Sequence, residues 1–268
     1  MDLLNYFRLN EQPFRISPDP RFLYLSDQVK EALAKVQYMT HERIGPLYMS
    51  GPIGSGKTSI MRRLYEQLNQ EERYNVQLLF APNVKTANAF LRLVMDAFGV
   101  PTQHGYTDSL KNFETFLLEQ YQAQRVPVLL VDEGQNMTRD ILKQVHYLLN
   151  YETNTEKLLQ LVLAGQEELA QKVLRYRELA SRMFPIAMNA MTPIDLQDML
   201  RFRWMVAGGN DLPFTDEAFK ELFVASKGLP RDAIKMADET LRELYIKKQQ
   251  KADGDLIQQI ATNLNLNK

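Results

Sequence analysis

The sequence contains no cysteine and no hydrophobic run long enough to cross a membrane. The absence of cysteine excludes a disulfide-stabilised scaffold, a thiol nucleophile and a cysteine-ligated zinc site. The longest apolar runs, such as Val126–Val131, have the length of a strand, whereas a membrane helix needs about 18 or more apolar residues. The N-terminus also lacks the basic and hydrophobic segments of a signal peptide. We therefore expect a soluble, cytoplasmic protein.

An excess of charge of one sign is absent too. The 268 residues carry 32 Lys and Arg against 33 Asp and Glu, which gives a formal net charge of −1. This balance gives no support to a histone-like or polybasic nucleic-acid binder and leaves a local basic patch for such a role. With 45% hydrophobic and 24% charged residues, the composition is that of a globular protein.

Strand-like and helix-like segments alternate between Pro46 and Met191. The predicted strands are Leu47–Ser50, Val76–Ala81, Val126–Val131, Leu159–Ala164 and Ile186–Met191. The predicted helices between them are 57–69, 86–98, 109–124, 138–150 and 167–180. Such alternation is typical of an α/β protein with a parallel sheet and helices on both faces.

The two ends of the chain have different patterns. Residues 1–25 are rich in aromatic residues and prolines, which predicts an extended arm held to the body by its aromatic side chains, followed by a helix to about Thr40. After Thr192 only helical patterns remain, at 195–207, 215–226, 230–249 and 254–264. We therefore divide the chain into residues 1–191, with arm and core, and residues 192–268, with helices alone.

A phosphate-binding motif follows the first predicted strand. The segment Gly51-Pro52-Ile53-Gly54-Ser55-Gly56-Lys57-Thr58 matches the P-loop pattern G-x-x-x-x-G-K-[ST] in full. Its glycines let backbone N–H groups curl around phosphate oxygens, and the helix that follows adds the positive end of its dipole. Lys57 can bridge the β- and γ-phosphates of ATP, and the Thr58 hydroxyl can ligate Mg²⁺. We assign this segment and Ser59 to ATP binding; the alternative is a chance match by a glycine-rich turn.

A second motif ends the strand Val126–Val131, where the apolar run gives way to Asp132 and Glu133. Two carboxylates at the end of a buried strand fit a Walker B motif, in which Asp132 holds Mg²⁺ and Glu133 acts as the general base on the attacking water. The alternative is a solvated strand terminus. Together with the P-loop, the pair predicts ATP hydrolysis as well as binding.

Several segments resemble those of ExeA-type AAA+ ATPases. They are the arm, residues 6–14 and 17–26, the two Walker motifs, Asp132-Glu133-Gly134-Gln135-Asn136, residues 158–166, and Gly228-Leu229-Pro230-Arg231. The resemblance covers nearly the whole chain. It implies the AAA+ P-loop NTPase fold, a five-stranded parallel αβα core followed by a small all-α lid, assembled as a ring or helical filament of identical subunits.

The resemblance also implies roles for further residues. Gln166, after the fourth strand, corresponds to sensor 1, near the γ-phosphate or the attacking water; a helix-capping role is the alternative. Arg231 matches the second-sensor arginine that contacts the nucleotide; the alternative is a surface arginine. Arg182 lies where the family has an arginine finger that completes a neighbour's site. Arg177 competes for that role, and a surface salt bridge is the alternative for either.

The chain departs from the secretion ExeA proteins because it ends soon after the lid, where those proteins continue into a membrane helix and a peptidoglycan-binding domain. Standalone ExeA-like ATPases also resemble the TnsC, TniB and IstB helpers of DNA transposition. We therefore expect an ATP-hydrolysing oligomeric switch that binds double-stranded DNA and helps a transposase. The alternatives are an ATPase for assembly of secretion or pilus machinery, and a nucleotide-gated scaffold that does not hydrolyse ATP.

The resemblance places DNA contacts after the second strand and after the Walker B strand. The corresponding residues are Lys85, Thr86, Arg139 and Lys143. A net charge near zero argues against DNA binding by a single chain, but an oligomer would multiply these few phosphate contacts. The alternative is an ordinary polar loop and helix face.

Two other features carry weaker expectations. His41, His104 and His146 lack the spacing of metal ligands and are expected on the surface or in loops. The aromatic arm is expected to clamp the core, with framing of adenine by Phe14 and Ile16 as the alternative.

Overall fold

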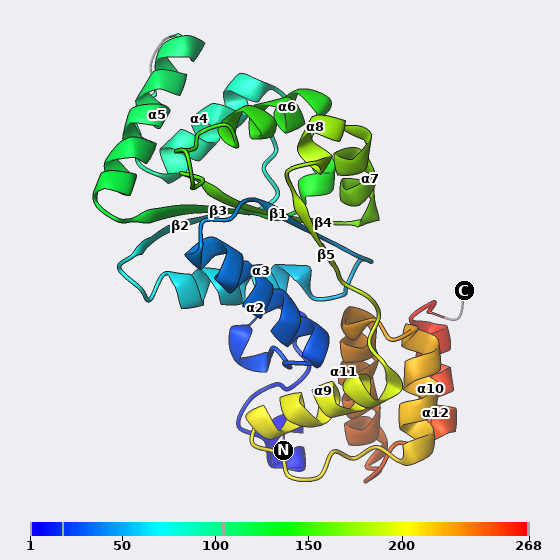
Figure 1. Cartoon of the computed structure of the whole chain (residues 1–268). Coiled ribbons are helices and arrows are strands. Elements are labelled where there is room, and N and C mark those ends of the chain that lie inside the picture. Colours follow the sequence, from blue (N-terminus) through cyan, green and yellow to red (C-terminus); the bar gives the residue numbers. More distant parts are fainter. Residues whose placement is uncertain (1, 18, 103–104, 267–268) are drawn as a thin grey trace. The chain divides into compact units, whose positions relative to one another are not determined.

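The computed structural model describes residues 2–17, 19–102 and 105–266, so Pro18 of the arm motif and His104 lie outside it (Figure 1). The chain forms two compact units. The sheet unit comprises Lys30–Gly51 and Ile60–Met188. The helical unit comprises Met1–Val29, Pro52–Ser59 and Asn189–Lys268, as far as these are described. The P-loop thus groups with the helical unit, although it follows directly from a strand of the sheet.

The sheet unit contains a five-stranded, all-parallel sheet with the order β2-β3-β4-β1-β5. Its strands are β1 Leu47–Ser50, β2 Tyr74–Leu79, β3 Val126–Val131, β4 Gln160–Gly165 and β5 Phe184–Ala187. The predicted α/β class and parallel sheet are therefore confirmed. The last strand begins two residues earlier than expected and ends four residues earlier, because β5 pairs only with the four residues of β1, between the bonds from Phe184 N–H to Pro46 O and from Met188 N–H to Ser50 O.

Helices cover both faces of this sheet (Figure 1). The helices are α2 Asp27–His41, α3 Lys57–Leu68, α4 Ala87–Ala97, α5 Tyr106–Gln122, α6 Arg139–Leu148, α7 Glu167–Arg175 and α8 Arg177–Ala180. The expected single helix 167–180 is interrupted at Tyr176, whose φ/ψ of −103°/88° is not helical. A short 3-10 turn, η2 Gly134–Asn136, follows the Walker B carboxylates.

Alternate residues of the strands pack against different helices. Leu129 and Val131 of β3, and Leu161 and Leu163 of β4, belong to one buried cluster with side chains of α4, α5, α6 and α7. All six residues of β3 are buried, as are all six of β4. Central parallel strands lack a solvent face, which explains why they read as continuous apolar runs rather than as an alternating pattern.

The helical unit is built from α9 Pro193–Val206, α10 Asp216–Ser226, α11 Pro230–Lys247 and α12 Gly254–Asn263. The expected extended arm contains a short helix, α1 Leu3–Phe7, and a 3-10 turn, η1 Pro20–Phe22. Leu9, Phe14 and Phe22 of the arm are buried in the same cluster as Trp204 and the other apolar side chains of these helices. The arm therefore packs on the C-terminal helices, which differs from the predicted grouping of the arm with the αβα core.

Arg203 of α9 ties the arm down. Its guanidinium donates hydrogen bonds to the carbonyl oxygens of Pro13 (3.0 Å), Arg15 (2.9 Å) and Phe22 (3.1 Å). The side chain is buried, and this burial lowers the pKa of Arg203 to about 10, so the group stays protonated at neutral pH. Three main-chain acceptors on one buried cation fix the course of the arm.

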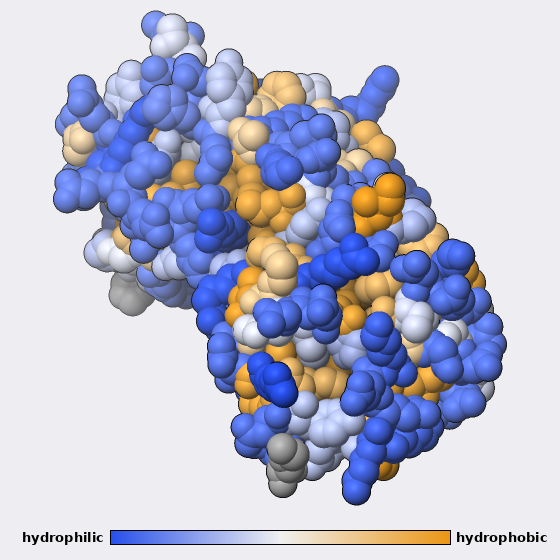
Figure 2. Space-filling view, turned by 90° about the horizontal axis from the view of Figure 1, so that it is seen from below, coloured by the Kyte–Doolittle hydropathy of each residue, from blue (hydrophilic) through white to orange (hydrophobic). Residues whose placement is uncertain are grey.

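The surface is of mixed polarity. Hydrophilic residues dominate the view in Figure 2, and hydrophobic residues show between them as separate patches. Ile194 and Val224 are among the exposed apolar side chains of the helical unit. No described helix is both long enough and apolar enough to span a membrane.

Candidate functional site

The P-loop leaves the carboxyl edge of the sheet, where β1 ends at Ser50 and pairs in register with Gly165 of β4. Gly51 has no space for a side chain, because a Cβ there would lie 2.1 Å from the carbonyl oxygen of Met188. Gly54 and Gly56 have φ values of +84° and +97°, a region that residues with a side chain rarely adopt. The glycines at these three positions are thus required by the backbone path of the motif.

Lys57 is the first residue of α3, and its side chain folds back over the loop. Nζ donates hydrogen bonds to the carbonyl oxygen of Pro52 (2.8 Å) and to Oγ of Ser55 (3.2 Å). Lys57 is buried, with 8% of its surface exposed. The ammonium group therefore lies against the loop, bonded to one of its carbonyl oxygens and one of its hydroxyl groups.

The lid motif contacts the P-loop within the helical unit. Arg231 lies in the first turn of α11, and its backbone N–H donates a hydrogen bond to the carbonyl oxygen of Gly54. A Cβ on Gly54 would lie 2.8 Å from Cβ of Arg231. The side chain of Arg231 is exposed. The start of α11 is therefore bonded directly to Gly54 of the P-loop segment.

The Walker B carboxylates follow β3. The backbone N–H of Asp132 bonds to the carbonyl oxygen of Leu79, which extends the β2–β3 ladder by one residue and leaves Asp132 buried. Glu133 then adopts a left-handed conformation, with φ/ψ of 57°/33°, and its N–H bonds to Oδ1 of Asp132 at 2.9 Å. The two consecutive carboxylates thus have different partners: Asp132 accepts from the Glu133 N–H, and Glu133 accepts from the side chain of Gln135.

Gln166 follows β4 and is the N-cap residue of α7. Within the described chain its side chain makes no capping hydrogen bond, so the alternative of a helix-capping role finds no support. Its backbone N–H donates to Oε1 of Gln135 at 3.0 Å. Gln135 also donates through Nε2 to the carboxylate of Glu133. The sensor-1 position and the candidate general base are thus connected through one side chain.

The two candidate trans-acting arginines lie around α8. Arg177 is its first residue and is exposed. Arg182 follows the helix, and its Nη1 donates to Oδ1 of Asn150. Burial and the positive charge of Arg182 lower the pKa of His146, whereas Glu178 opposes this shift. Arg182 therefore has a neutral amide partner on its own subunit, which is not the salt bridge that the surface alternative names.

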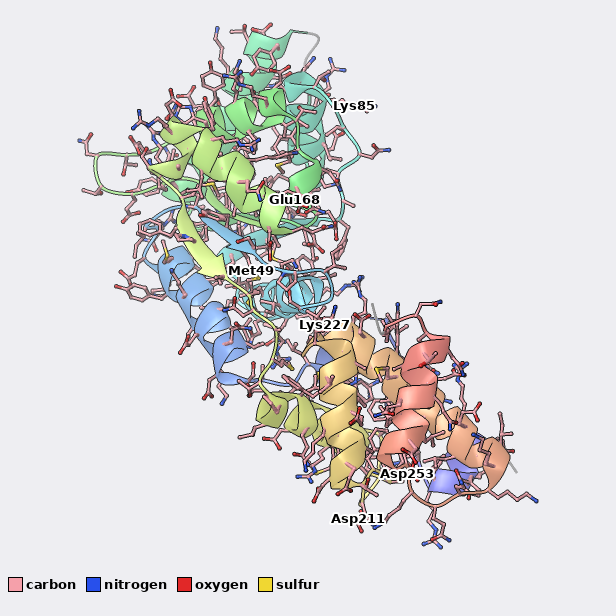
Figure 3. The ribbon with its side chains drawn as sticks, turned by 90° about the vertical axis from the view of Figure 1, so that its right-hand side faces the viewer. Met49, Lys85, Glu168, Asp211, Lys227 and Asp253 are labelled. Atoms are coloured by element: carbon pink, nitrogen blue, oxygen red, sulfur yellow. The ribbon has the colours of Figure 1, made fainter. Side chains whose placement is uncertain are left out.

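The two segments expected to face DNA lie side by side. The Thr138 hydroxyl donates to the carbonyl oxygen of Lys85 at 3.0 Å, which joins the loop after β2 to the start of α6. Lys85, Arg139 and Lys143 are all exposed, and Lys85 lies on the outer side of its loop in Figure 3. Thr86 is the N-cap of α4, and its hydroxyl accepts from Ala89 N–H. Lys85, Thr86 and Arg139 lie beside this contact in the chain, and Lys143 follows one turn further along α6; we call these four residues the loop surface.

Comparison with known families decides the class of protein. The family described as "AAA domain" matches residues 40–173, half of the chain. The chain belongs to this AAA domain family. It is also 36% identical over 234 residues to general secretion pathway protein A of Aeromonas hydrophila, in an alignment that covers 84% of this chain and 42% of that protein. The chain thus spans less than half the length of this relative.

Solved structures share the fold of this AAA domain. A structure of Drosophila ORC bound to DNA has a TM-score of 0.67 at 18% identity, over 98% of this chain and 66% of that one. Cdc6p from Pyrobaculum aerophilum gives 0.64 at 14% identity, over 87% and 67%. The Thermotoga maritima RuvB branch migration motor gives 0.60 at 16% identity, over 90% and 70%. These likenesses confirm the predicted fold, an α/β AAA+ core followed by helices.

The structure also bears on the expectations for the aromatic arm and for the histidines. Phe14 is 1% exposed and stacks near Trp204, so it clamps the helical unit and has no open face for adenine. Ile16 is exposed. His41 is exposed and His146 is partly buried on α6, and the described residues contain no group of three or more His, Asp or Glu that could hold a metal ion.

Sequence reasoning missed Gln135 as a site residue of the AAA domain. Lys172 of α7 was missed as well; its Nζ donates to the carbonyl oxygens of Gln135 and of Met137 (2.9 Å for the latter). Gln135 comes two residues after Glu133, and Lys172 lies on a helix. Neither position belongs to a sequence spacing that marks a functional site. Only the return of the chain through β4 and α7 brings these groups to the Walker B turn.

Proposed function

We propose that this AAA domain binds and hydrolyses ATP with Mg²⁺ and works as an oligomer of identical subunits. The observation that carries the proposal is the complete P-loop, with Lys57 folded over a loop that has two glycines at positive φ. The acidic pair after β3 supports hydrolysis in addition to binding. The nucleotide-binding segment is Gly51 to Ser59, joined by Arg231.

The available side chains suit Mg²⁺. Thr58 supplies a hydroxyl oxygen and Asp132 a carboxylate oxygen, and hard oxygen donors of these two kinds are the ligands that Mg²⁺ takes in P-loop proteins. When bound, the ion neutralises charge on the β- and γ-phosphates.

The remaining roles belong to the chain's own residues. Lys57 and the loop N–H groups hold the phosphates, and Glu133 orients and deprotonates the attacking water. Gln166 orients the same water or the γ-phosphate. Arg231 contacts the nucleotide from the lid. Arg182, or else Arg177, stabilises negative charge in the site of a neighbouring subunit.

Two substitutions test the ATPase. We expect Lys57→Ala to abolish ATP binding, measured with a fluorescent ATP analogue. Glu133→Gln should keep ATP binding but lower kcat by about 10²–10⁴-fold, the usual contribution of a general base. Glu168→Gln is the matched control, since Glu168 is an exposed carboxylate in the first turn of α7 (Figure 3). Unchanged turnover in both Lys57→Ala and Glu133→Gln would refute the proposal.

We further propose that the oligomer binds double-stranded DNA through the loop surface and assists a transposase. The contact between Lys85 and Thr138 supports this, because it unites the two segments into one exposed surface with Lys85, Arg139 and Lys143. The fold is shared with a structure titled as ORC bound to DNA. Because few basic residues per chain contribute, binding should depend on ATP-driven assembly and fall steeply with salt.

Electron microscopy with ATP, with and without duplex DNA, tests this second step. We expect DNA-dependent rings or filaments with wild-type protein, and weakened binding with Lys85→Glu and Arg139→Glu. Lys111→Glu on the exposed side of α5 is the control. An assembly that ignores DNA would contradict the proposal. A co-purified transposase whose activity requires ATP would support the transposition role.

A secretion or pilus assembly role is the alternative, and the relative named general secretion pathway protein A favours it. Binding to membrane or envelope proteins, without affinity for DNA, would support this role. A scaffold that does not hydrolyse ATP is the remaining alternative. Assembly with ATP in the absence of Glu133-dependent turnover would favour the scaffold.

A further inference from the structure

The side chain of Gln135 connects the two halves of the hydrolytic machinery in the sheet unit. Its Nε2 donates to the carboxylate of Glu133, and its Oε1 accepts from the backbone N–H of Gln166 at 3.0 Å. A carboxylate can only accept and a backbone N–H can only donate, so the two partners fix which end of the amide faces each. A glutamine is therefore the side chain that satisfies both partners at this position.

The surroundings hold Gln135 in place. Gly165 ends β4 directly beside it: a Cβ on Gly165 would lie 2.7 Å from Oε1 and 3.0 Å from the backbone nitrogen of Gln135. Lys172 of α7 donates to the carbonyl oxygen of Gln135. The amide is thus packed against the end of one strand and anchored to the following helix.

Glu133 depends on such support because of its backbone. It has φ of +57°, a left-handed conformation that is strained for a non-glycine residue. A carboxylate on a strained turn has several orientations available unless a neighbour selects one. A hydrogen bond from a fixed amide selects one orientation.

We propose that Gln135 is a positioning residue that holds the Glu133 carboxylate in its working orientation and couples this orientation to the Gln166 main chain. This inference rests on the proposed ATP hydrolysis and adds a residue to it. Gln135 acts through Glu133, so its loss should slow the chemical step and leave ATP binding unchanged. The P-loop, which binds the phosphates, does not take part in these bonds.

Two substitutions separate positioning from a structural role. Gln135→Met keeps the length of the side chain and removes both hydrogen bonds. Gln135→Glu keeps an acceptor for the Gln166 N–H but removes the donor to Glu133. Asn136→Ala is the matched control, because Asn136 is the exposed neighbour in the same turn.

Steady-state ATPase kinetics supply the readout. We expect both Gln135 variants to lower kcat by about 10- to 100-fold, the effect of a misplaced catalytic group, with KM changed less than about twofold. In a Glu133→Gln background the same substitutions should have no further effect on kcat, since they act through that carboxylate. Asn136→Ala should match the wild type in kcat and KM.

Three results would overturn the inference. Gln135→Glu with wild-type kcat would show that only the bond to Gln166 matters, which is a structural role. A raised kcat in either variant would show that Gln135 restrains Glu133 in an inactive pose. Wild-type kcat in both would remove any role. Failure of the underlying proposal is distinguishable, because Glu133→Gln would then leave turnover unchanged.

Discussion

The backbone N–H of Arg231 donates a 3.2 Å hydrogen bond to the carbonyl oxygen of Gly54. This bond joins the first turn of the lid helix α11 to the P-loop, two segments that are 177 positions apart in the sequence (231 minus 54). Any movement of the loop on phosphate binding must therefore either carry the helix end with it or break this bond.

Replacement of Gly54 by alanine should test this contact. The new Cβ would lie 2.8 Å from Cβ of Arg231, at a φ of +84°. Gly56→Ala is the matched control, because its φ is +97° and nothing lies within 4 Å of a Cβ there. Backbone strain alone should lower the free energy of unfolding by about 1–2 kcal/mol in both variants. Urea unfolding without nucleotide should show an additional loss only for Gly54→Ala; equal losses would mean that the helix end yields freely.

The Arg231 side chain should matter for nucleotide and not for folding. It is exposed, so Arg231→Ala should leave the free energy of unfolding, measured in urea, within about 0.5 kcal/mol of wild type. We expect it to weaken ATP binding or lower kcat at least severalfold. Lys235→Ala, an exposed cation one turn further along α11, should do neither. Equal effects of the two substitutions would show that only general positive charge is involved.

Arg203→Met should destabilise the helical unit strongly. The substitution leaves the carbonyl oxygens of Pro13, Arg15 and Phe22 without their donor, and an orphan acceptor costs about 1–3 kcal/mol where it is buried, as at Pro13 and Phe22. We expect a loss of about 3 kcal/mol or more by urea unfolding. Arg201→Met on the same helix removes an exposed cation 5.5 Å from the Phe219 ring and should cost less than about 1 kcal/mol. A small effect of Arg203→Met would mean that apolar packing alone holds the arm.

His146 offers a pH-dependent probe of the region around Arg182. Burial and then the charge of Arg182 lower its pKa below the ordinary 6.5, so Arg182→Gln should raise it, as NMR titration of the ring protons would measure. A lowered folded-state pKa means that the folded protein binds the proton less tightly than the unfolded chain. The corresponding stability is present above about pH 6.5 and is lost as the pH falls. His146→Gln should reduce that slope; an unchanged titration in Arg182→Gln would place the arginine elsewhere in solution.

Parts of the fold could be predicted because their signals are local. The strand Val126–Val131 coincides with its predicted bounds, since a central parallel strand is apolar throughout. The helix start at Pro230 coincides with its predicted bound, because proline favours the first turn of a helix, whereas α9 starts at Pro193, two residues before the predicted start at Asp195. The arm was harder, because aromatic residues indicate burial without naming the partner surface. Phe14 is buried against α9, which no local pattern could indicate.

The sequence by itself determined the P-loop, the acidic end of the Walker B strand and the alternation that makes a parallel sheet, because each depends on residues that are neighbours along the chain. Tertiary structure alone decided which groups meet. It brought Gln135 between Glu133 and Gln166, and Arg203 under the carbonyl oxygens of the arm. Hydrogen bonds between distant segments depend on strand order and helix packing, and these are set by the burial of the whole core rather than by any local run of residues.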